Sequence, residues 1–393
     1  MDLASFLLFR RCRSNFVGLV RLDAIGDFVL WLPSAQALVT ELRAQNKHVI
    51  LIANHIWASW AKVLLDVDKV VEVDTNRMGE DLSYRIKVMF QVRGLMLGTI
   101  ICPTYSRVPG DGNDALVFGS GASVRIASAG YQSSQRIASW LRSVINLGYS
   151  NLIPAADRHM NGKLKSEPEI NESFMKGLGI RVPHLIAKLP HRQDDSSSEL
   201  YRPSGKYVVV IPGAGWSGRA WPVTRYAEVA KKINNMGYKI VVSGSASEKS
   251  LCDSLAATCN GINLAGKTTL QELANVIRFA RLVIGNDSSG IHIAVASGVD
   301  SICVKWGGGG HFGRFIPYAQ SLLPEGLRAN AVYHLMDCFG CNGDCSFPLV
   351  NGKVQCIESI SVDQVISAVC DILSLDVVDR NTVVGHFDSD IKH

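Results

Sequence analysis

The sequence predicts an α/β protein made of two Rossmann-like domains that face each other, each built on a parallel sheet. In the first half, helical patterns alternate with four apolar strand-like runs, at residues 16–22, 48–53, 70–73 and 98–102. The alternation starts again after residue 206, with runs at 207–211, 239–243, 281–285 and 301–304. This alternation is typical of parallel sheets with helices on both faces. A polar stretch at residues 191–199 separates the two halves and indicates a linker.

The expected domain boundaries follow from this pattern. We expect an N-terminal domain over residues 1–190, a linker over 191–206, a C-terminal domain over 207–375 and a loose tail over 376–393. The glycine-rich residues 103–131 are expected to form loops that line a cleft, and residues 362–373 the last helix. The length of 393 residues, with 47% hydrophobic and 19% charged residues, suits two domains with large cores.

Residues 282–296 are the most informative stretch of the chain. A buried-strand run ends in a polar turn, and a helix of small residues is expected to begin near Ser288 or Ser289. Such a helix start offers free backbone N–H groups, here near Ser288, Ser289 and Gly290, which bind phosphate at the carboxyl edge of a parallel sheet. The alternative is that Asp287 and Ser288 only cap the helix. His292, one turn further, is either a ligand contact or a packed side chain.

A second phosphate-binding pattern follows the strand at 207–211. Gly213 belongs to a glycine-rich loop whose backbone N–H groups can approach an anion. Arg219 in the same loop can donate two hydrogen bonds to phosphate oxygens, unless it is only a solvated surface residue. Pro222 suits the first turn of a helix expected over 223–236.

A third pattern follows the first strand. Gly26 permits a tight turn, and Asp27 lies at the start of a helix expected from about Phe28 to Leu42. Asp27 is either an N-cap or a carboxylate that accepts a proton in a cleft. The turn lacks the G-x-G-x-x-G fingerprint of dinucleotide-binding proteins.

The three patterns together resemble glycosyltransferase family 9, the heptosyltransferases that build the inner core of lipopolysaccharide. The first motif of that family corresponds to Gly26, Asp27 and Pro33; the second to Pro212, Gly213, Arg219, Trp221 and Pro222; and the third to Asp287, Ser288, His292 and Ala294. The resemblance implies a GT-B fold, in which two Rossmann-like domains face each other and the terminal helix often packs back on the first domain. It also implies transfer of a heptose from ADP-heptose to a lipid-linked glycan acceptor of the lipopolysaccharide core, at the inner face of the cytoplasmic membrane.

The chain departs from the family pattern at three places. Arg219 replaces the usual Lys, Ser289 stands where a glycine normally follows, and Gly290 comes one position later. Residues 305–314, rich in glycine, replace a Gly-Pro loop. The identity of the sugar therefore stays open.

The chemistry of such a transfer assigns roles to these residues. We expect Arg219 and the N–H groups near Ser288, Ser289 and Gly290 to hold the diphosphate as negative charge grows on it. Asp27, on the opposite domain, is expected to take the acceptor proton in a single inverting displacement. Asp287 binds a hydroxyl or caps its helix. The departing diphosphate needs no proton, so we predict no second carboxylate. No residue pattern in the sequence suggests a catalytic metal.

Charge and hydropathy limit the partners. The net charge of +5 suits anionic ligands or an anionic membrane surface, and no aromatic-interleaved basic stripe predicts binding to nucleic acid. No apolar run is long enough for a spanning helix, so we expect a cytoplasmic protein. The run Leu3–Phe9 is too short for an export signal; it is either a peripheral membrane contact or a frayed leader.

The ten cysteines fall into two groups. Six are scattered, mostly in apolar surroundings that suit small core residues: Cys12, Cys102, Cys252, Cys259, Cys303 and Cys370. The other four, Cys338, Cys341, Cys345 and Cys356, form a Cys-x2-Cys-x3-Cys-x10-Cys insertion. This spacing favours a structural zinc site over an iron–sulfur cluster, and free or transiently oxidised thiols are the alternative.

Three other functions remain open at this stage. A nicotinamide-dependent oxidoreductase could use two Rossmann-like domains, although the missing fingerprint argues against it. A non-catalytic, metal-stabilised nucleotide-binding protein would be centred on the cysteine cluster. Another GT-B enzyme, such as a nucleotide-sugar epimerase, would share the fold and the phosphate site.

Overall fold

The computed structural model describes residues 13–105, 107, 112–130, 136–154, 159–160, 163–190, 199, 201–307, 318, 320–339, 341 and 345–374. The leader run 3–9, linker residues 191–198, loop residues 308–314 and the tail 376–393 lie outside the described residues. The chain divides into two compact units. The N-terminal unit comprises residues 1–157 and 168–185, and the C-terminal unit comprises 158–167 and 186–393.

The N-terminal unit is built on a six-stranded parallel sheet of order β3-β2-β1-β4-β5-β6. The strands are β1 (Arg13–Arg21), β2 (His48–Asn54), β3 (Lys69–Val73), β4 (Leu97–Cys102), β5 (Val124–Ser128) and β6 (Asn151–Ile153). The helices are α2 (Ile25–Ala44), α3 (His55–Leu64), α4 (Thr75–Glu80), α5 (Leu82–Arg93), α6 (Asn113–Gly119), α7 (Arg136–Asn146) and α8 (Glu167–Gly177).

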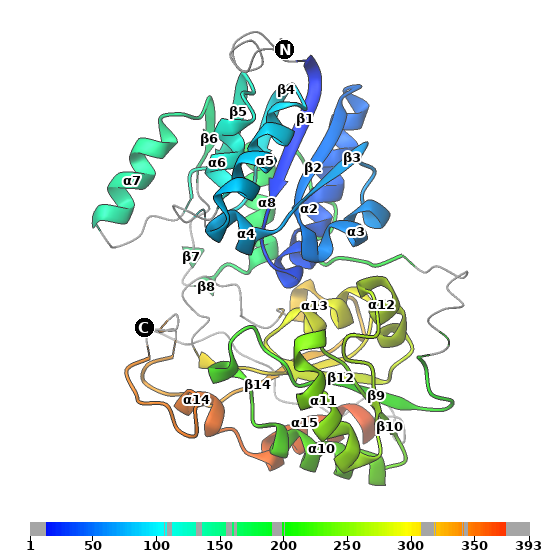
Figure 1. Cartoon of the computed structure of the whole chain (residues 1–393). Helices are drawn as coiled ribbons and strands as arrows, with labels where there is room; N and C mark the ends of the chain where they lie inside the picture. The colour runs from blue at the N-terminus through cyan, green and yellow to red at the C-terminus, as the bar shows by residue number, and fades with distance from the viewer. Residues whose placement is uncertain are drawn as a thin grey trace. The chain divides into compact units, whose positions relative to one another are not determined.

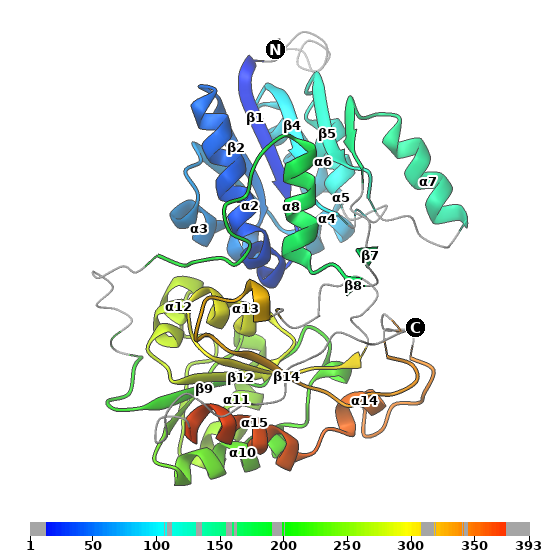
Figure 2. The same ribbon diagram turned by 180° about the vertical axis from the view of Figure 1, so that it is seen from behind.

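Helices cover both faces of this sheet. Figure 1 shows α5 and α6 in front of the strands, and Figure 2, seen from behind, shows α2 and α8 in front. Under α5 and α6, Val20 and Ile52 pack with Val88 and Leu116 in one buried cluster. Side chains buried on both faces explain why the central strands read as continuous apolar runs.

The C-terminal unit repeats the plan with a sheet of order β11-β10-β9-β12-β13-β14, again parallel. Its strands are β9 (Tyr207–Ile211), β10 (Lys239–Val242), β11 (Ile262–Asn263), β12 (Leu282–Asn286), β13 (Ser301–Val304) and β14 (Ala329–Val332). The α-helices are α10 (Val223–Asn235), α11 (Lys249–Cys259), α12 (Leu270–Arg278), α13 (Ser289–Ala296), α14 (Gln355–Glu358) and α15 (Val362–Leu373). Short helical turns are η1 (Ser217–Arg219), η2 (Ala246–Glu248) and η4 (Gln320–Leu322), and a small hairpin pairs β7 (His159–Met160) with β8 (Lys163–Leu164).

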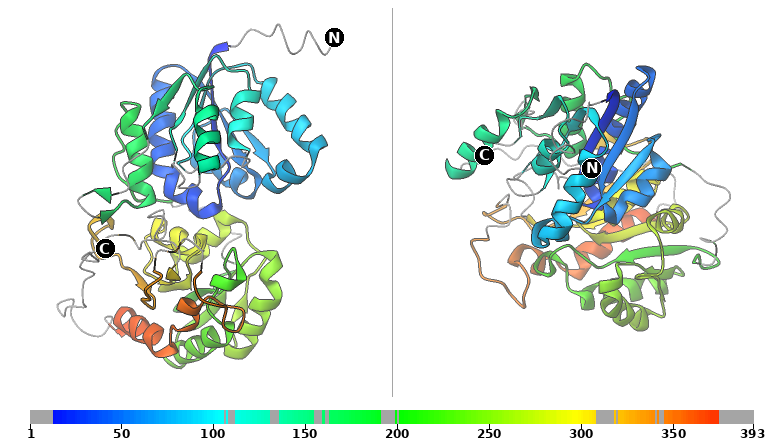
Figure 3. Two further views of the ribbon diagram at one scale, coloured as in Figure 1. Left: turned by 90° about the vertical axis from the view of Figure 1, so that its left-hand side faces the viewer. Right: turned by 45° about the horizontal axis from the view of Figure 1, so that its top comes forward.

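The core of the C-terminal unit lies between its sheet and the layer formed by α10, α11 and α15, while α12 and α13 cover the other face (Figures 1 and 3). Val365, Val369 and Ile372 of α15 are buried in that core with Val208 and Ile302. The apolar face of α15, the last described helix, therefore packs within its own unit, where it covers β13 and β14.

All eight expected strands are present, but four further strands of the two sheets were missed. The missed strands are β5, β6, β11 and β14, which are short and carry few fully buried side chains. The expectation that residues 103–131 form only loops is wrong, because α6 and β5 lie within that range. Among the described residues, no helix is both long and apolar enough to cross a membrane.

Candidate functional site

The strand orders place one switch point in each sheet, and ligands of open α/β folds bind there, at the carboxyl ends of the strands. In the C-terminal unit the switch point lies between β9 and β12, which pair directly, with Gly285 opposite Ile211. The loop after β9 carries Arg219, and the turn after β12 leads into α13. Two of the three motifs therefore meet at one sheet edge.

Asn286 joins these two motifs. Its side-chain amide donates to the carbonyl oxygens of Pro212, at 2.6 Å, and Gly213, at 3.2 Å. Its side-chain oxygen accepts a hydrogen bond from the backbone N–H of Trp221 at 2.9 Å. Asn286 is fully buried, so these bonds hold both ends of the Arg219 loop against the end of β12.

The start of α13 has the features of an anion site. Ser288 is the N-cap residue, yet its side chain makes no capping hydrogen bond, and its Oγ is buried without a partner among the described residues. A Cβ on Gly290 would lie 2.3 Å from Cδ1 of Ile211, so glycine lets the first turn of the helix pack closely on β9. The N–H groups of this first turn are not satisfied by a side-chain cap, which leaves them for a ligand.

Arg219 lies in η1 and is half-buried. Its Nε is buried without a hydrogen-bond partner in the described part of the chain, and its guanidinium carbon lies 5.7 Å from the ring centroid of Trp306. A guanidinium placed against an aromatic face keeps its charge and its forked donors. Arg219 can therefore bind an anion at the same edge as α13.

Asp287 and His292 have protein partners. The Oδ2 of Asp287 lies 3.4 Å from Nζ of Lys305, which follows β13, and both side chains are buried. Asp287 thus forms an ion pair rather than the cap of α13. The Nδ1 of His292 lies 2.9 Å from the hydroxyl of Tyr318. Burial raises the pKa of Tyr318, and the hydroxyl stays protonated.

Glu248 and Lys305 are two candidate residues that the motifs did not single out. The Glu248 carboxylate lies directly against Gly213, where a side chain of any size would collide with it. The same carboxylate accepts a 2.7 Å hydrogen bond from the backbone N–H of Ser245. Both residues follow strands at the carboxyl edge of the sheet, and that position is the signal that could have identified them.

In the N-terminal unit, β1 and β4 flank the switch point, and Asp27 follows β1 in the first turn of α2. Ala24 is the N-cap residue, so Asp27 is not the cap, and its side chain is half-buried. Trp57 donates from its indole N–H to the carbonyl of Asp23 at 2.8 Å and stacks on Phe28 with ring centroids 4.3 Å apart. These contacts fix the turn that carries Asp27.

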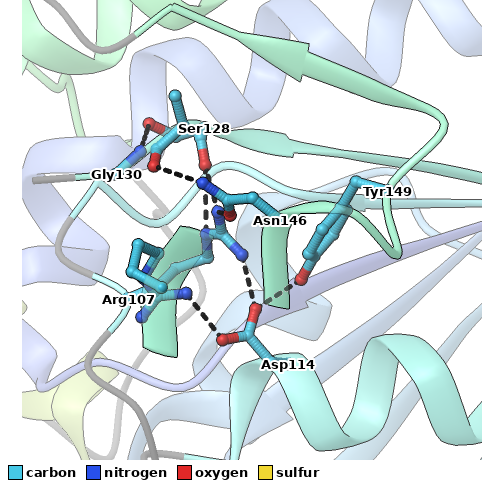
Figure 4. A network of polar contacts seen from close by, with 8 residues as sticks. Arg107, Asp114, Ser128, Gly130, Asn146 and Tyr149 are labelled. Atoms are coloured by element: carbon cyan, nitrogen blue, oxygen red, sulfur yellow. Dashed lines mark hydrogen bonds and ion pairs between the residues drawn. The ribbon is translucent and has the colours of Figure 1, made fainter. Parts of the chain in front are cut away.

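A buried polar network lies on the β4 side of this unit (Figure 4). Asp114 accepts hydrogen bonds from Arg107, Arg142 and Tyr149, and Arg107 also donates to the carbonyl of Ser128. Burial alone would raise the pKa of Asp114, but the two cations and the Tyr149 hydroxyl outweigh it, and the pKa is lowered. The network ties the loop after β4 to α6 and α7.

The four clustered cysteines all line one cavity of the C-terminal unit, of about 10 Å³. The backbone N–H of Gly307 donates to Sγ of Cys356 at 3.3 Å. Burial raises the pKa of the Cys356 thiol, and the three neighbouring thiols raise it further, against the opposing effect of Gly307. Elsewhere among the described residues, Cys102, Cys252, Cys259 and Cys303 are buried, as expected of core residues.

Two parallel six-stranded sheets of the same strand order, each with polar loops at its switch point, are the two Rossmann-like domains that the GT-B fold requires. Residues 173–304 match the family model of glycosyltransferase family 9 (heptosyltransferase). The match confirms the predicted resemblance and includes the second and third motifs, whereas the first motif, at residues 26–33, lies outside the matched residues.

Curated relatives are lipopolysaccharide heptosyltransferases at modest identity. The chain is 35% identical to lipopolysaccharide heptosyltransferase 2 of Salmonella typhimurium strain LT2 over 92 residues, which is 22% of this chain and 26% of that protein. It is 23% identical to lipooligosaccharide heptosyltransferase 2 of Campylobacter jejuni over 198 residues, 49% of this chain and 59% of the relative. The first of these matches spans about a quarter of the relative's length.

Solved structures share the fold over nearly the whole chain. A family 9 glycosyl transferase from Veillonella parvula has a TM-score of 0.68 at 15% identity, with 93% of this chain and 99% of that chain covered. The structure of ADP-heptose lps heptosyltransferase II from E. coli has a TM-score of 0.60 at 16% identity, with 92% and 99% covered. At identities of 15% and 16%, the similarity to these structures shows the GT-B fold alone.

Proposed function

We propose that this chain is an inverting glycosyltransferase that moves a sugar, with a heptose favoured, from a nucleotide-diphosphate donor to a lipopolysaccharide-core or related glycan acceptor. The observation that carries the proposal is the tie made by Asn286. It gathers the Arg219 loop and the start of α13 at one edge of the C-terminal sheet. An arginine and the N-terminus of a helix at one edge suit a diphosphate.

The donor half of the site follows from these groups. Arg219 and the N–H groups near Ser288, Ser289 and Gly290 bind the diphosphate and stabilise the charge that it gains on leaving. The carboxylate of Glu248 beside Gly213 can accept hydrogen bonds from ribose or sugar hydroxyls. The names of solved relatives, which include an ADP-heptose lps heptosyltransferase and a heptosyltransferase with ADP-2-deoxy-2-fluoro heptose, support ADP-heptose as the favoured donor.

Asp27 supplies the base in this proposal. The acceptor hydroxyl attacks the anomeric carbon from the face opposite the diphosphate, and its proton passes to the Asp27 carboxylate. The bond from the anomeric carbon to the diphosphate oxygen breaks at the same time, and the electron pair leaves with the diphosphate. One displacement inverts the configuration, and the scheme assigns no step to a metal ion. Action on a lipid-linked acceptor at the cytoplasmic membrane stays a prediction.

The experiment that tests the proposal uses the full chain and a panel of donors. Thermal shift with ADP, UDP, GDP and CDP, each as the diphosphate and as a sugar conjugate, should select one base, with ADP expected. Release of the nucleoside diphosphate is then measured with a lipopolysaccharide-core acceptor, and NMR of the product gives the anomeric configuration. A product that retains the donor configuration contradicts the displacement, and no binding of any diphosphate contradicts the proposal as a whole.

A further inference from the structure

The cysteine insertion is a feature that the proposed transfer does not use. Cys338, Cys341, Cys345 and Cys356 come from two segments of the chain, yet they line the same cavity, together with Trp306 and Phe339. The cavity volume of about 10 Å³ is close to the smallest volume that holds one water molecule, so the cavity has room for one small ion.

The chemistry of the lining selects the kind of ion. Four thiols in apolar and aromatic surroundings match the soft, tetrahedral sulfur set that binds zinc or a single iron ion. The N–H of Gly307 already donates to Sγ of Cys356. Hydrogen bonds of this kind to ligating atoms orient them and tune the metal.

In this structure the four cysteine thiols do not surround a common point. Among the described residues, no group of three or more Cys, His, Asp or Glu side chains is arranged to hold a metal ion. Cys341 and Cys345 lie outside the regular elements, whereas Cys356 is fixed in α14. Binding therefore requires the four thiols to come closer together than they lie in this structure.

The same insertion holds the loop that carries Arg219. The backbone N–H of Val354 donates to the carbonyl of Gly218 at 2.9 Å, and Nζ of Lys353 donates to the carbonyl of Ser217 at 2.8 Å. Trp306 gives a second link, because its side chain lines the cavity and its ring centroid lies 5.7 Å from the guanidinium carbon of Arg219. A ligand that holds the cysteines in place therefore also restrains η1 through these contacts.

We propose that the four cysteines close around one zinc or iron ion, and that this centre holds the Arg219 loop in its diphosphate-binding position. Each thiol that binds the ion releases its proton to solvent, and no electron transfer is involved. The effect on donor affinity rests on the proposed function; the metal site and its effect on the loop do not.

The first experiment measures metal in the full chain. Elemental analysis should find about one zinc or iron per chain, and visible absorption distinguishes thiolate-bound iron from zinc. After chelation, added Co²⁺ should give the thiolate charge-transfer and tetrahedral bands. Cys341→Ser should lose the ion, whereas Cys370→Ser, in α15, should keep it. Absence of metal together with absence of the cobalt spectrum overturns the site, and so does full metal content in Cys341→Ser.

The second experiment measures the loop. Hydrogen exchange of residues 213–221 in the wild-type chain should become about tenfold faster after chelation and recover when zinc is restored, because the bonds that hold the loop weaken. Exchange in α12, on the opposite face of the sheet, serves as the control. Unchanged exchange of the loop after the metal is removed overturns the link. Neither readout needs a nucleotide, so a failure of the proposed function is distinguished from a failure of this inference.

Discussion

Lys305 and Asp287 form a buried ion pair at the ends of β13 and β12, with Nζ 3.4 Å from Oδ2 and side chains 5% and 7% exposed. Lys305 begins the glycine-rich stretch in which the chain departs from the family pattern. Lys305 therefore places a second cation, besides Arg219, beside the turn that leads into α13. A buried pair of this kind is costly to break, because the remaining charge stays in a low-dielectric site.

The first prediction concerns this pair. Lys305→Met should lower the free energy of unfolding by about 3–5 kcal/mol, because Asp287 loses its cation while it stays buried. Asp287→Asn combined with Lys305→Met should cost clearly less than the sum of the two single changes. Urea unfolding of the four proteins measures both quantities. If the free energies of unfolding of the single variants stay within about 0.5 kcal/mol of wild type, the pair does not stabilise the fold.

The second prediction concerns Asp27. Asp27→Asn keeps the size of the side chain but removes the proton acceptor, so transfer should fall about 10²–10⁴-fold. The affinity for the nucleoside diphosphate should stay unchanged, since that ligand is assigned to the other unit. Calorimetry and a product assay measure the two effects. Asp66→Asn, whose side chain is 83% exposed, is the matched control and should leave both unchanged. Full turnover by Asp27→Asn would reject Asp27 as the base.

The third prediction separates phosphate binding from nucleoside binding. Arg219→Met should weaken ADP binding about 10- to 100-fold, which is the loss expected when hydrogen bonds to a charged phosphate are removed. Adenosine has no phosphate, so its binding should stay nearly unchanged. Arg219→Lys introduces the residue usual in the family and should recover part of the loss. Arg181→Met, on the surface of the N-terminal unit, is the control. Equal losses for ADP and adenosine would contradict a phosphate role.

The fourth prediction concerns pH and the network of Figure 4. The pKa of Asp114 is lowered in the folded chain, so its contribution to stability is present above the unfolded value of about 3.9. That contribution is lost as the pH falls through the lowered folded pKa. The difference in unfolding free energy between wild type and Asp114→Asn should therefore be about 3–5 kcal/mol near pH 7 and shrink below pH 4. Chemical denaturation at several pH values tests this, and a difference independent of pH would contradict it.

The sequence predicted the elements whose pattern is strong and local. Long apolar runs such as β1 and β9 are buried on both faces, so composition alone identifies them as strands. β14 has only half-buried residues, and β5 begins with the exposed Val124, so neither shows a clear pattern. Such strands receive their structure from pairing with their neighbours, which a local pattern does not contain.

The candidate site was predictable in part for the same reason. Arg219 and Ser288 stand at motif positions, Gly290 follows one position later than the usual glycine, and the structure brings all three to one edge of the sheet. Glu248 belongs to no motif, and its place against Gly213 depends on how η2 packs beside β9. The link from Val354 to Gly218 joins residues more than a hundred positions apart, which no local pattern predicts.

The division of the chain into units has a practical consequence for fragment studies. The polypeptide passes from one unit to the other after residues 157, 167 and 185. A fragment that begins at residue 186 lacks the hairpin β7–β8, and a fragment that ends at 157 lacks the whole of α8. No single cut therefore yields two whole units. In a split version of this protein, the first fragment has to reach residue 185 to complete the N-terminal unit, and it then also carries residues 158–167 of the C-terminal unit.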